Sequence, residues 1–217
     1  MSDSNEGSIH EAVSLDGDPP VRGILHRARD GADAIVLTHG AGSNANAPLL
    51  RALARAFADD GIAVLRCDLP FRQSRASGPP SPAGAERDRR GLAAAVSAVR
   101  APRCFLGGHS YGGRQASMLL AESPSLARGL LLLSYPLHPP GKPERRRIEH
   151  LPSLRVPTLF VHGDRDPFGA PDEIDAARAL VAAPAELLVL PRAAHALHAD
   201  ATTARTIVAA FRRLVGA

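Results

Sequence analysis

Short apolar runs alternate with longer amphipathic stretches along this chain of 217 residues. Eight runs have the length and composition of strands, at residues 9–15, 21–28, 34–38, 62–67, 104–107, 129–134, 158–161 and 185–190. Turn-forming residues from Asp16 to Pro20 separate the first two runs, which predicts an antiparallel pair. The remaining runs alternate with helical patterns, and this alternation is typical of a parallel sheet covered by helices.

The helical stretches place apolar residues three and four positions apart. They predict helices at residues 46–60, 83–99, 111–122, 171–181 and 202–214. In the first helix, Asn46 is predicted to be the N-cap, Pro48 lies in the first turn, and Gly61 ends the helix. Residues 71–82 and 136–152 break the alternation and are predicted to be loops. Ligands of open α/β sheets bind beyond the carboxyl ends of the strands, so these loops are candidate walls of a site.

Composition places the chain among soluble globular proteins, because 45% of its residues are hydrophobic and 22% are charged. The length predicts a single α/β domain over residues 9–217, preceded by a flexible N-terminus over residues 1–8. No apolar run reaches the roughly 18 residues that a membrane span needs, which excludes an integral membrane protein. The polar, acidic start of the chain is unlike a secretory signal, so we expect a cytoplasmic location.

The net charge of +4 does not point to a nucleic-acid partner. The arginines are spread along the chain, Lys142 is the only lysine, and there is no tryptophan to stack on bases. Cys67 and Cys104 are too few for a disulfide scaffold or a four-thiolate metal site and are predicted to be core thiols. The sequence therefore predicts neither nucleic-acid nor membrane partners.

The sharpest local signal is Gly-His-Ser-Tyr-Gly over residues 108–112, between a predicted strand and a predicted helix. A turn this tight strains the backbone of Ser110, and the glycines at 108 and 112 leave room for it. The turn exposes the hydroxyl of Ser110, and the positive end of the following helix favours a developing oxyanion. Ser110 is therefore the predicted nucleophile.

The candidate acid and base that would activate Ser110 lie after later predicted strands. A serine hydroxyl becomes nucleophilic when an imidazole takes its proton, and the imidazole needs a carboxylate to orient it. Asp166 and His195 are assigned these roles, and the order serine, acid, histidine is the one that α/β-hydrolases use. Asp164 is the rival of Asp166, and His198 is the rival of His195.

Two backbone amides are predicted to hold the oxyanion. One is the amide of Tyr111, directly after the serine, and the other comes from the loop that follows the third predicted strand. Ala41 is our choice in that loop, with Gly42 as the alternative.

The chain resembles an α/β-hydrolase of the dienelactone-hydrolase-like part of that superfamily along nearly its whole length. Five motifs carry a narrower resemblance, at residues 38–42, 66–72, 112–114, 135–143 and 162–169. They are similar to bacterial relatives of testis-expressed protein 30 and of a chromatin-associated subunit with a related domain. The resemblance implies the α/β-hydrolase fold, and the apolar runs predict a mostly parallel eight-stranded sheet flanked by helices. The segment 136–152 is too short for a lid domain, so no large lid is predicted. The resemblance also aligns Ser110, Asp166 and His195 with nucleophile, acid and base.

Other polar residues near the strand ends have structural interpretations. His39, His109 and His162 are predicted to support loop geometry, and their spacing does not favour a metal site. Arg114 is predicted to pair with a loop carbonyl or with a carboxylate such as Asp68, with substrate anchoring as the alternative. The basic run 145–147 is predicted to be a solvated loop in preference to an anion site.

Together these features predict a carboxylesterase-like serine hydrolase that acts on a small-molecule ester or related acyl substrate through an acyl-enzyme. No cofactor or metal is predicted. A non-catalytic interaction module is the alternative, suggested by the chromatin-associated relative. That alternative predicts a broken triad, whereas all three positions are filled here. Lactone, thioester and peptide hydrolysis and acyl transfer stay open as variants of the same chemistry.

Overall fold

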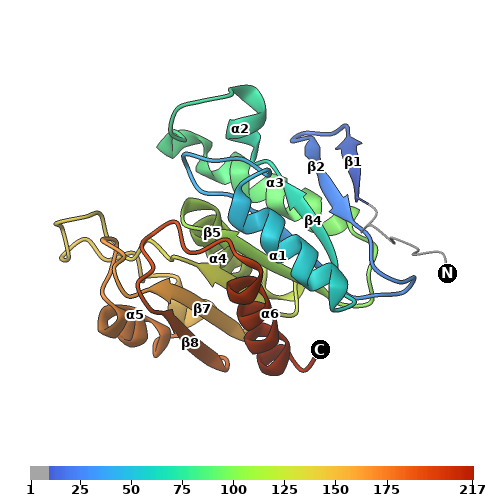
Figure 1. The fold of residues 1–217 in the computed structure, drawn as a ribbon. Coiled ribbons are helices and arrows are strands. Elements are labelled where there is room, and N and C mark those ends of the chain that lie inside the picture. The colour runs from blue at the N-terminus through green and yellow to red at the C-terminus, as the bar shows by residue number, and fades with distance from the viewer. Residues whose placement is uncertain (1–9) are drawn as a thin grey trace.

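The computed structural model describes residues 10–217, so the flexible segment predicted over residues 1–8 lies outside the described residues. The strands are β1 (His10–Leu15), β2 (Val21–His26), β3 (Ala34–Thr38), β4 (Ala63–Cys67), β5 (Cys104–His109), β6 (Leu130–Leu133), β7 (Thr158–Gly163) and β8 (Ala185–Leu190). The helices are α1 (Pro48–Asp59), α2 (Pro70–Ser74), α3 (Ala85–Ala98), α4 (Tyr111–Glu122), α5 (Pro171–Arg178) and α6 (Ala201–Val215) (Figure 1).

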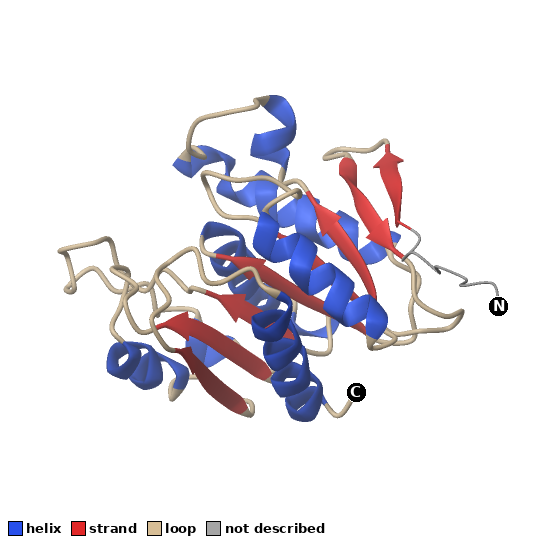
Figure 2. Cartoon of the chain, viewed as in Figure 1, coloured by secondary structure: helices blue, strands red, loops and turns tan. Residues whose placement is uncertain are grey.

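All eight strands form one sheet in the order β1-β2-β4-β3-β5-β6-β7-β8. The first two strands pair antiparallel with their neighbours, and β3 to β8 are parallel. The predicted antiparallel opening pair and mostly parallel sheet are confirmed. The segment between β6 and β7 forms a loop with a short 3₁₀ turn at Leu151–Ser153, and no large lid is inserted (Figure 2).

Helices cover both faces of the sheet, as Figure 1 shows. One face packs against α1 and α6, and the other packs against α3, α4 and α5. Strand β6 consists of four leucines and contributes to the core on both faces of the sheet. Leu130 and Leu132 belong to one core cluster, and Leu131 and Leu133 belong to the other. A strand buried on both faces needs apolar side chains at every position, because successive side chains point to opposite faces.

The start of α1 differs from the prediction at its N-cap. Ala47 is the N-cap residue and makes no side-chain hydrogen bond, so the assignment of Asn46 was wrong. The side-chain oxygen of Asn46 instead lies 3.4 Å from Nη1 of Arg66, which donates to it. Pro48 begins the helix, and Gly61 follows it at φ +82°, a conformation that favours glycine, as predicted.

The segment predicted as a loop over residues 71–82 begins with a helix, α2. Its five residues are too few for a periodic pattern, and tertiary contacts hold it instead. Phe71 and Arg72 are buried, and the Phe71 N–H donates to a carboxylate oxygen of Asp88 on α3. The prediction was wrong here because these partners are distant in sequence.

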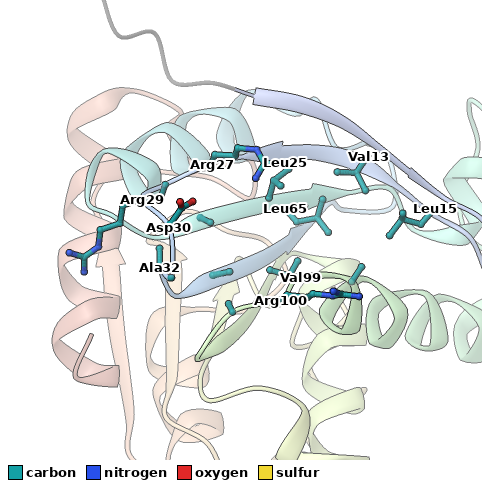
Figure 3. A pocket seen from close by; sticks show the side chains of 16 residues that line it. Val13, Leu15, Leu25, Arg27, Arg29, Asp30, Ala32, Leu65, Val99 and Arg100 are labelled. Carbon is teal, nitrogen blue, oxygen red and sulfur yellow. The ribbon is translucent and has the colours of Figure 1, made fainter.

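A cavity of about 400 Å³ lies at the amino ends of the parallel strands, between the β1–β2 hairpin and the end of α3 (Figure 3). Its apolar lining includes Val13, Leu25, Leu65 and Val99. None of the described residues that line it is a serine, cysteine or histidine. In the part of the chain that the structure describes, no helix has both the length and the apolar character needed to cross a membrane.

Candidate active site

Ser110 lies in the sharp turn between β5 and α4, with φ 51° and ψ −117°. Positive φ is strained for a residue with a side chain, so neighbouring contacts must hold the turn. The Ser110 N–H donates to the carbonyl of Leu133 on the adjacent strand at 2.8 Å. A Cβ added to Gly108 would lie 2.6 Å from the nitrogen of Gly113, and one added to Gly112 would overlap the carbonyl oxygen of His39. The predicted glycines are thus required by close backbone approach.

The structure brings Ser110, His195 and Asp166 together in one hydrogen-bonded chain. His195 Nε2 lies 2.7 Å from the Ser110 hydroxyl oxygen. His195 Nδ1 lies 2.8 and 3.0 Å from the two carboxylate oxygens of Asp166. An Nδ1–H that donates to the carboxylate leaves Nε2 unprotonated, which lets it accept the serine proton.

Asp166 is buried and keeps its negative charge. Burial alone would raise its pKa, but hydrogen bonds from His195 and from the N–H of Phe168, at 2.9 Å, outweigh that effect. The pKa of Asp166 is therefore below its ordinary value. An ionised carboxylate is the form needed to orient an imidazole and to stabilise its positive charge.

His195 is held from two further directions. The ring of Phe168 lies against its ring, with 4.2 Å between centroids. His109 Nε2 donates to the His195 backbone carbonyl at 2.7 Å. The rivals considered from the sequence, Asp164 and His198, are exposed and lie outside this hydrogen-bonded chain.

The loop after β3 packs against the turn that carries Ser110. A Cβ added to Gly40 would lie 3.0 Å from Nδ1 of His109 and 3.4 Å from Cβ of Ser110. Ala41 follows directly, and Tyr111 begins α4 on the other side of the serine. The two amides predicted to hold an oxyanion thus belong to backbone segments that both adjoin Ser110.

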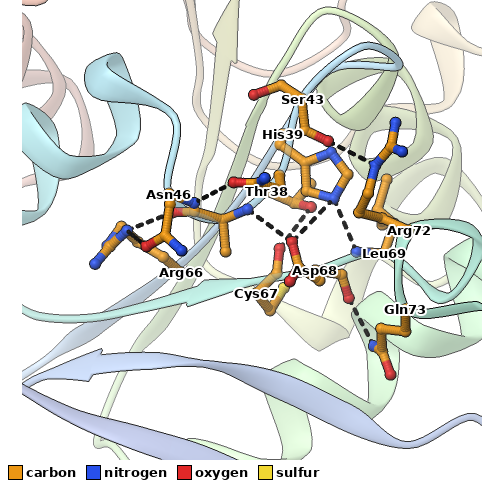
Figure 4. Close-up of polar contacts among 12 residues, drawn as sticks. Thr38, His39, Ser43, Asn46, Arg66, Cys67, Asp68, Leu69, Arg72 and Gln73 are labelled. Carbon is orange, nitrogen blue, oxygen red and sulfur yellow. Dashed lines mark hydrogen bonds and ion pairs between the residues drawn. The ribbon is translucent and has the colours of Figure 1, made fainter. Parts of the chain in front are cut away.

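Arg72 of α2 ties this loop to its surroundings (Figure 4). Its guanidinium donates to the carbonyls of Ala41 at 2.7 Å and Ser43 at 2.8 Å. It also donates to the carbonyls of Gly78 at 3.1 Å and Arg75 at 3.3 Å, and only 8% of Arg72 is exposed. One buried cation therefore uses all three of its nitrogens to hold backbone carbonyls.

A second set of bonds holds the same loop from the end of β4. A carboxylate oxygen of Asp68 accepts from the N–H of Ala45 at 2.7 Å. His39 Nδ1 donates to the carbonyl of Gly40 at 2.8 Å, and Nε2 accepts from the N–H of Leu69 at 3.1 Å. Burial lowers the pKa of His39, which favours the neutral ring that this pattern needs.

Asp88 connects α3 to the start of α4, and the sequence reasoning missed it. Its carboxylate accepts from the Tyr111 hydroxyl at 2.7 Å and from the Phe71 N–H at 3.0 Å. Burial raises the pKa of Asp88, while these hydrogen bonds act in the opposite direction. The available signal was a carboxylate on the apolar face of a helix, four residues before the buried Leu92.

The predicted pairing of Arg114 with Asp68 was wrong. Asp68 binds the loop after β3, whereas Arg114 lies on the face of α4 toward the segment between β6 and β7. There its charge acts on Tyr135, Arg147 and His150. The reason is topological, because β4 and that segment lie on opposite sides of β5 in the sheet.

His162 supports the turn that carries Asp166, as predicted for a structural histidine. Its Nε2 donates to the carbonyl of Gly169 at 2.9 Å. Within residues 10–217, no group of three or more His, Cys, Asp or Glu side chains could hold a metal ion. Burial raises the pKa of Cys67 to about 12 and that of Cys104 to about 11, so both thiols stay protonated. Cys67 lies in the core, and the partly buried Cys104 packs against it.

Comparison with known proteins matches residues 31–215 to a family described as an alpha/beta hydrolase domain. A dienelactone hydrolase from Anabaena variabilis superposes with a TM-score of 0.75 at 20% identity, covering 94% of this chain and 97% of its own. Est1E from Butyrivibrio proteoclasticus, with ferulic acid bound, has a TM-score of 0.77 at 15% identity, covering 95% and 100%. An α/β serine hydrolase without a lid from Xanthomonas campestris has a TM-score of 0.69 at 18% identity, covering 95% of each chain. At these identities the structural matches show a shared fold.

Proposed function

The chain belongs to the α/β-hydrolase family, and we propose that it is a serine hydrolase that cleaves a small carboxylic ester or a related acyl compound. The observation that carries the proposal is the continuous chain from the Ser110 hydroxyl through His195 to the buried Asp166. Solved structures named as a dienelactone hydrolase and as a ferulic acid-binding Est1E support ester or lactone substrates. We also propose, from the motif resemblance, a relationship to the bacterial relatives of testis-expressed protein 30, and a cytoplasmic location stays a prediction from the sequence.

In the first half of the reaction, the Ser110 oxygen attacks the carbonyl carbon while His195 Nε2 takes the hydroxyl proton. Asp166 holds Nδ1–H and stabilises the imidazolium that forms. The carbonyl π electrons move onto oxygen, and the amides of Ala41 and Tyr111 stabilise the resulting oxyanion. The N-terminus of α4 adds a favourable dipole at the same place.

In the second half, the tetrahedral intermediate collapses and the bond to the alcohol breaks. His195 gives its proton to the leaving oxygen, and the acyl group stays on Ser110 as an ester. Water then attacks this acyl-enzyme with His195 as general base, which releases the carboxylic acid and restores the serine. These steps need no cofactor.

A fluorophosphonate probe tests the proposal, because it reacts with an activated serine hydroxyl. We expect the native protein to be labelled and the Ser110→Ala and His195→Ala variants to be unlabelled. His198→Ala is the matched control, since it removes an exposed imidazole three residues from the base, and it should label like the native protein.

Labelling at the native rate in Ser110→Ala would contradict the assignment of the nucleophile. A folded native protein that shows no labelling would favour the interaction-module alternative, in which the serine is not activated.

A further inference from the structure

One turn of α4 beyond the candidate nucleophile, Arg114 carries a charge without a partner. Its backbone N–H donates to the carbonyl of Ser110 at 2.9 Å, which places it in the first turn of the helix. Its side chain makes no hydrogen bond or ion pair with any described residue, and its Nε is buried. A partly buried cation in a folded protein normally has an anionic or carbonyl partner, because desolvation without one is unfavourable.

A second guanidinium, that of Arg147, lies in the segment between β6 and β7. The Arg147 N–H donates to the carbonyl of Leu137 at 2.8 Å, and its Nη1 donates to the carbonyl of Pro136 at 2.9 Å. The Tyr135 hydroxyl donates to the Arg147 carbonyl. These bonds fold the segment back onto the end of β6. The carbonyl of Leu133 on β6 accepts the Ser110 N–H. Nε and Nη2 of Arg147 make no hydrogen bond with the described residues.

Among the described residues, no carboxylate neutralises this pair. Neither Arg114 nor Arg147 forms an ion pair, whereas Arg146, directly before Arg147 in sequence, lies 3.7 Å from the carboxylate of Glu173. Glu149 is the acidic residue whose charge acts on this region, but it is exposed and forms no ion pair. The lack of acidic partners thus distinguishes these two arginines from their neighbour.

The side chains around the two arginines are uncharged at neutral pH. Burial and the charge of Arg114 lower the pKa of His150 to about 4, so its imidazole is neutral. Burial raises the pKa of the Tyr135 hydroxyl, which stays protonated. The Ser117 hydroxyl bridges the carbonyl of Arg114 and Nε2 of His150 at 2.8 and 2.7 Å. Positive charge therefore predominates around the two arginines. Neutral hydroxyl and imidazole groups hold the backbone of this region through hydrogen bonds.

We propose that Arg114 and Arg147 form an anion subsite for a carboxylate or phosphate group on the acyl substrate of Ser110. The inference rests on the proposed function and specifies its substrate class. Side chains on a helix lean toward its N-terminus, which directs the Arg114 side chain back toward the turn that starts at Ser110, and its charge acts on Tyr111 there. Both anions offer two or more oxygens to the N–H groups of a guanidinium.

The proposal predicts that substrates carry an anion a few bonds from the scissile carbonyl. Half-esters of short dicarboxylic acids meet this requirement, and so do esters with a phosphate or phosphonate group in place of the second carboxylate. In both, the anion fills the position that the protein leaves without a counter-charge.

A matched series of esters tests this. 4-Nitrophenyl butyrate, mono-4-nitrophenyl succinate and 4-nitrophenyl 3-phosphonopropionate differ only in a terminal methyl, carboxylate or phosphonate group. We expect the native enzyme to prefer one anionic ester over the butyrate in kcat/KM, after subtraction of spontaneous hydrolysis. The preference should fall about tenfold or more in Arg114→Gln and Arg147→Gln, because each loses a charge-assisted bond. Which anionic ester is preferred identifies the anion.

Arg145→Gln is the matched control, because it removes the same charge from an exposed position in the same segment, and its preference should equal that of the native enzyme. Arg114→Lys keeps the charge and should retain part of the preference. The ratio of two substrates is unaffected by a smaller folded fraction, so a partly unfolded variant stays informative.

An equal preference in the native enzyme and Arg114→Gln would overturn the subsite. Should none of the three esters turn over, succinate and inorganic phosphate are tested as protectants against fluorophosphonate labelling, with protection expected in the native protein and lost in Arg114→Gln. If neither succinate nor inorganic phosphate protects the native protein from labelling, the proposed anion subsite is also overturned. A native protein that does not label at all would contradict the proposed function itself, so the two failures are distinguishable.

Discussion

The two ends of the sheet differ in how they hold their connecting segments. At the carboxyl ends of the strands, buried side chains that bind backbone groups hold the loops around Ser110. Arg72 is one example (Figure 4), and Asp88 is another. At the amino ends, a cavity of about 400 Å³ has a lining of mainly apolar side chains and arginines (Figure 3). The candidate triad lies at the opposite end from this cavity, where a larger space of about 550 Å³ has Asp68 and Arg72 in its lining.

The physical reason is the direction of parallel strands. All their carboxyl ends meet at one edge, where the chain must turn into helices whose N-terminal N–H groups are unpaired. Polar side chains that bind these turns therefore accumulate there, and reactive side chains carried on the same turns become fixed. At the amino edge the helices end, so the unpaired groups there are carbonyls that need donors. The cavity lies at this edge between the hairpin and the end of α3.

The largest expected effect comes from breaking the candidate triad at the carboxyl edge. Asp166→Asn should lower kcat for an ester substrate by about 10⁴-fold, because an amide favours the wrong histidine tautomer. The measurement is steady-state kinetics on the native protein and the variant. Asp164→Asn makes the same change two residues earlier at an exposed position and should leave kcat within about twofold. Equal losses in both variants would contradict the assignment of Asp166.

Asp166→Asn should also change how the stability of the protein depends on pH. The pKa of Asp166 is below its ordinary value in the folded protein, so its stabilising contribution is complete above the unfolded-state pKa of about 3.9. That contribution is lost as the pH falls through the lower folded-state value. Denaturant unfolding between pH 5 and pH 2 should therefore show a shallower loss of stability in Asp166→Asn than in the native protein.

A smaller effect is expected from loosening the loop after β3. Arg72→Leu removes the bonds to the carbonyls of Ala41 and Ser43, and kcat should fall by roughly 10- to 100-fold with little change in KM. Arg72→Lys can still bind one carbonyl and should recover part of the loss. The control is Arg75→Leu, at an exposed position next to α2, which should stay within about twofold of native kcat. A change in KM alone for Arg72→Leu would refute a role in positioning the oxyanion amides.

The smallest effect on catalysis is expected at the amino edge. Leu25→Ala enlarges the cavity where Leu25 lies opposite Leu65 in the sheet. We expect it to lower the free energy of unfolding by about 1–2 kcal/mol, less than for a fully buried leucine because Leu25 is partly exposed. The value of kcat/KM should stay within about twofold. A tenfold loss in a folded variant would instead make the cavity part of the functional site.

Most of the fold could be predicted because its signals are local. Burial on both faces makes β6 apolar at every position and β3 apolar up to its last residue, Thr38, and their neighbours repeat the pattern. The helix α4 begins and ends where the sequence predicts, since glycines and Ser110 mark its start. The short helix α2 and the N-cap of α1 were missed, because both depend on contacts with residues far away in the chain.

By itself, the sequence determined the order of the strands and of every helix except α2, and it also pointed to the three residues of the candidate triad. Apolar periodicity and the glycines of a strained turn are both patterns of neighbouring residues. Only the tertiary structure decided which polar residues meet, as in the pairing of Tyr111 with Asp88 and the isolation of Arg114 from Asp68. Such contacts depend on which strands are neighbours in the sheet and on how the loops pack there. These are properties of the whole chain, and no short pattern encodes them.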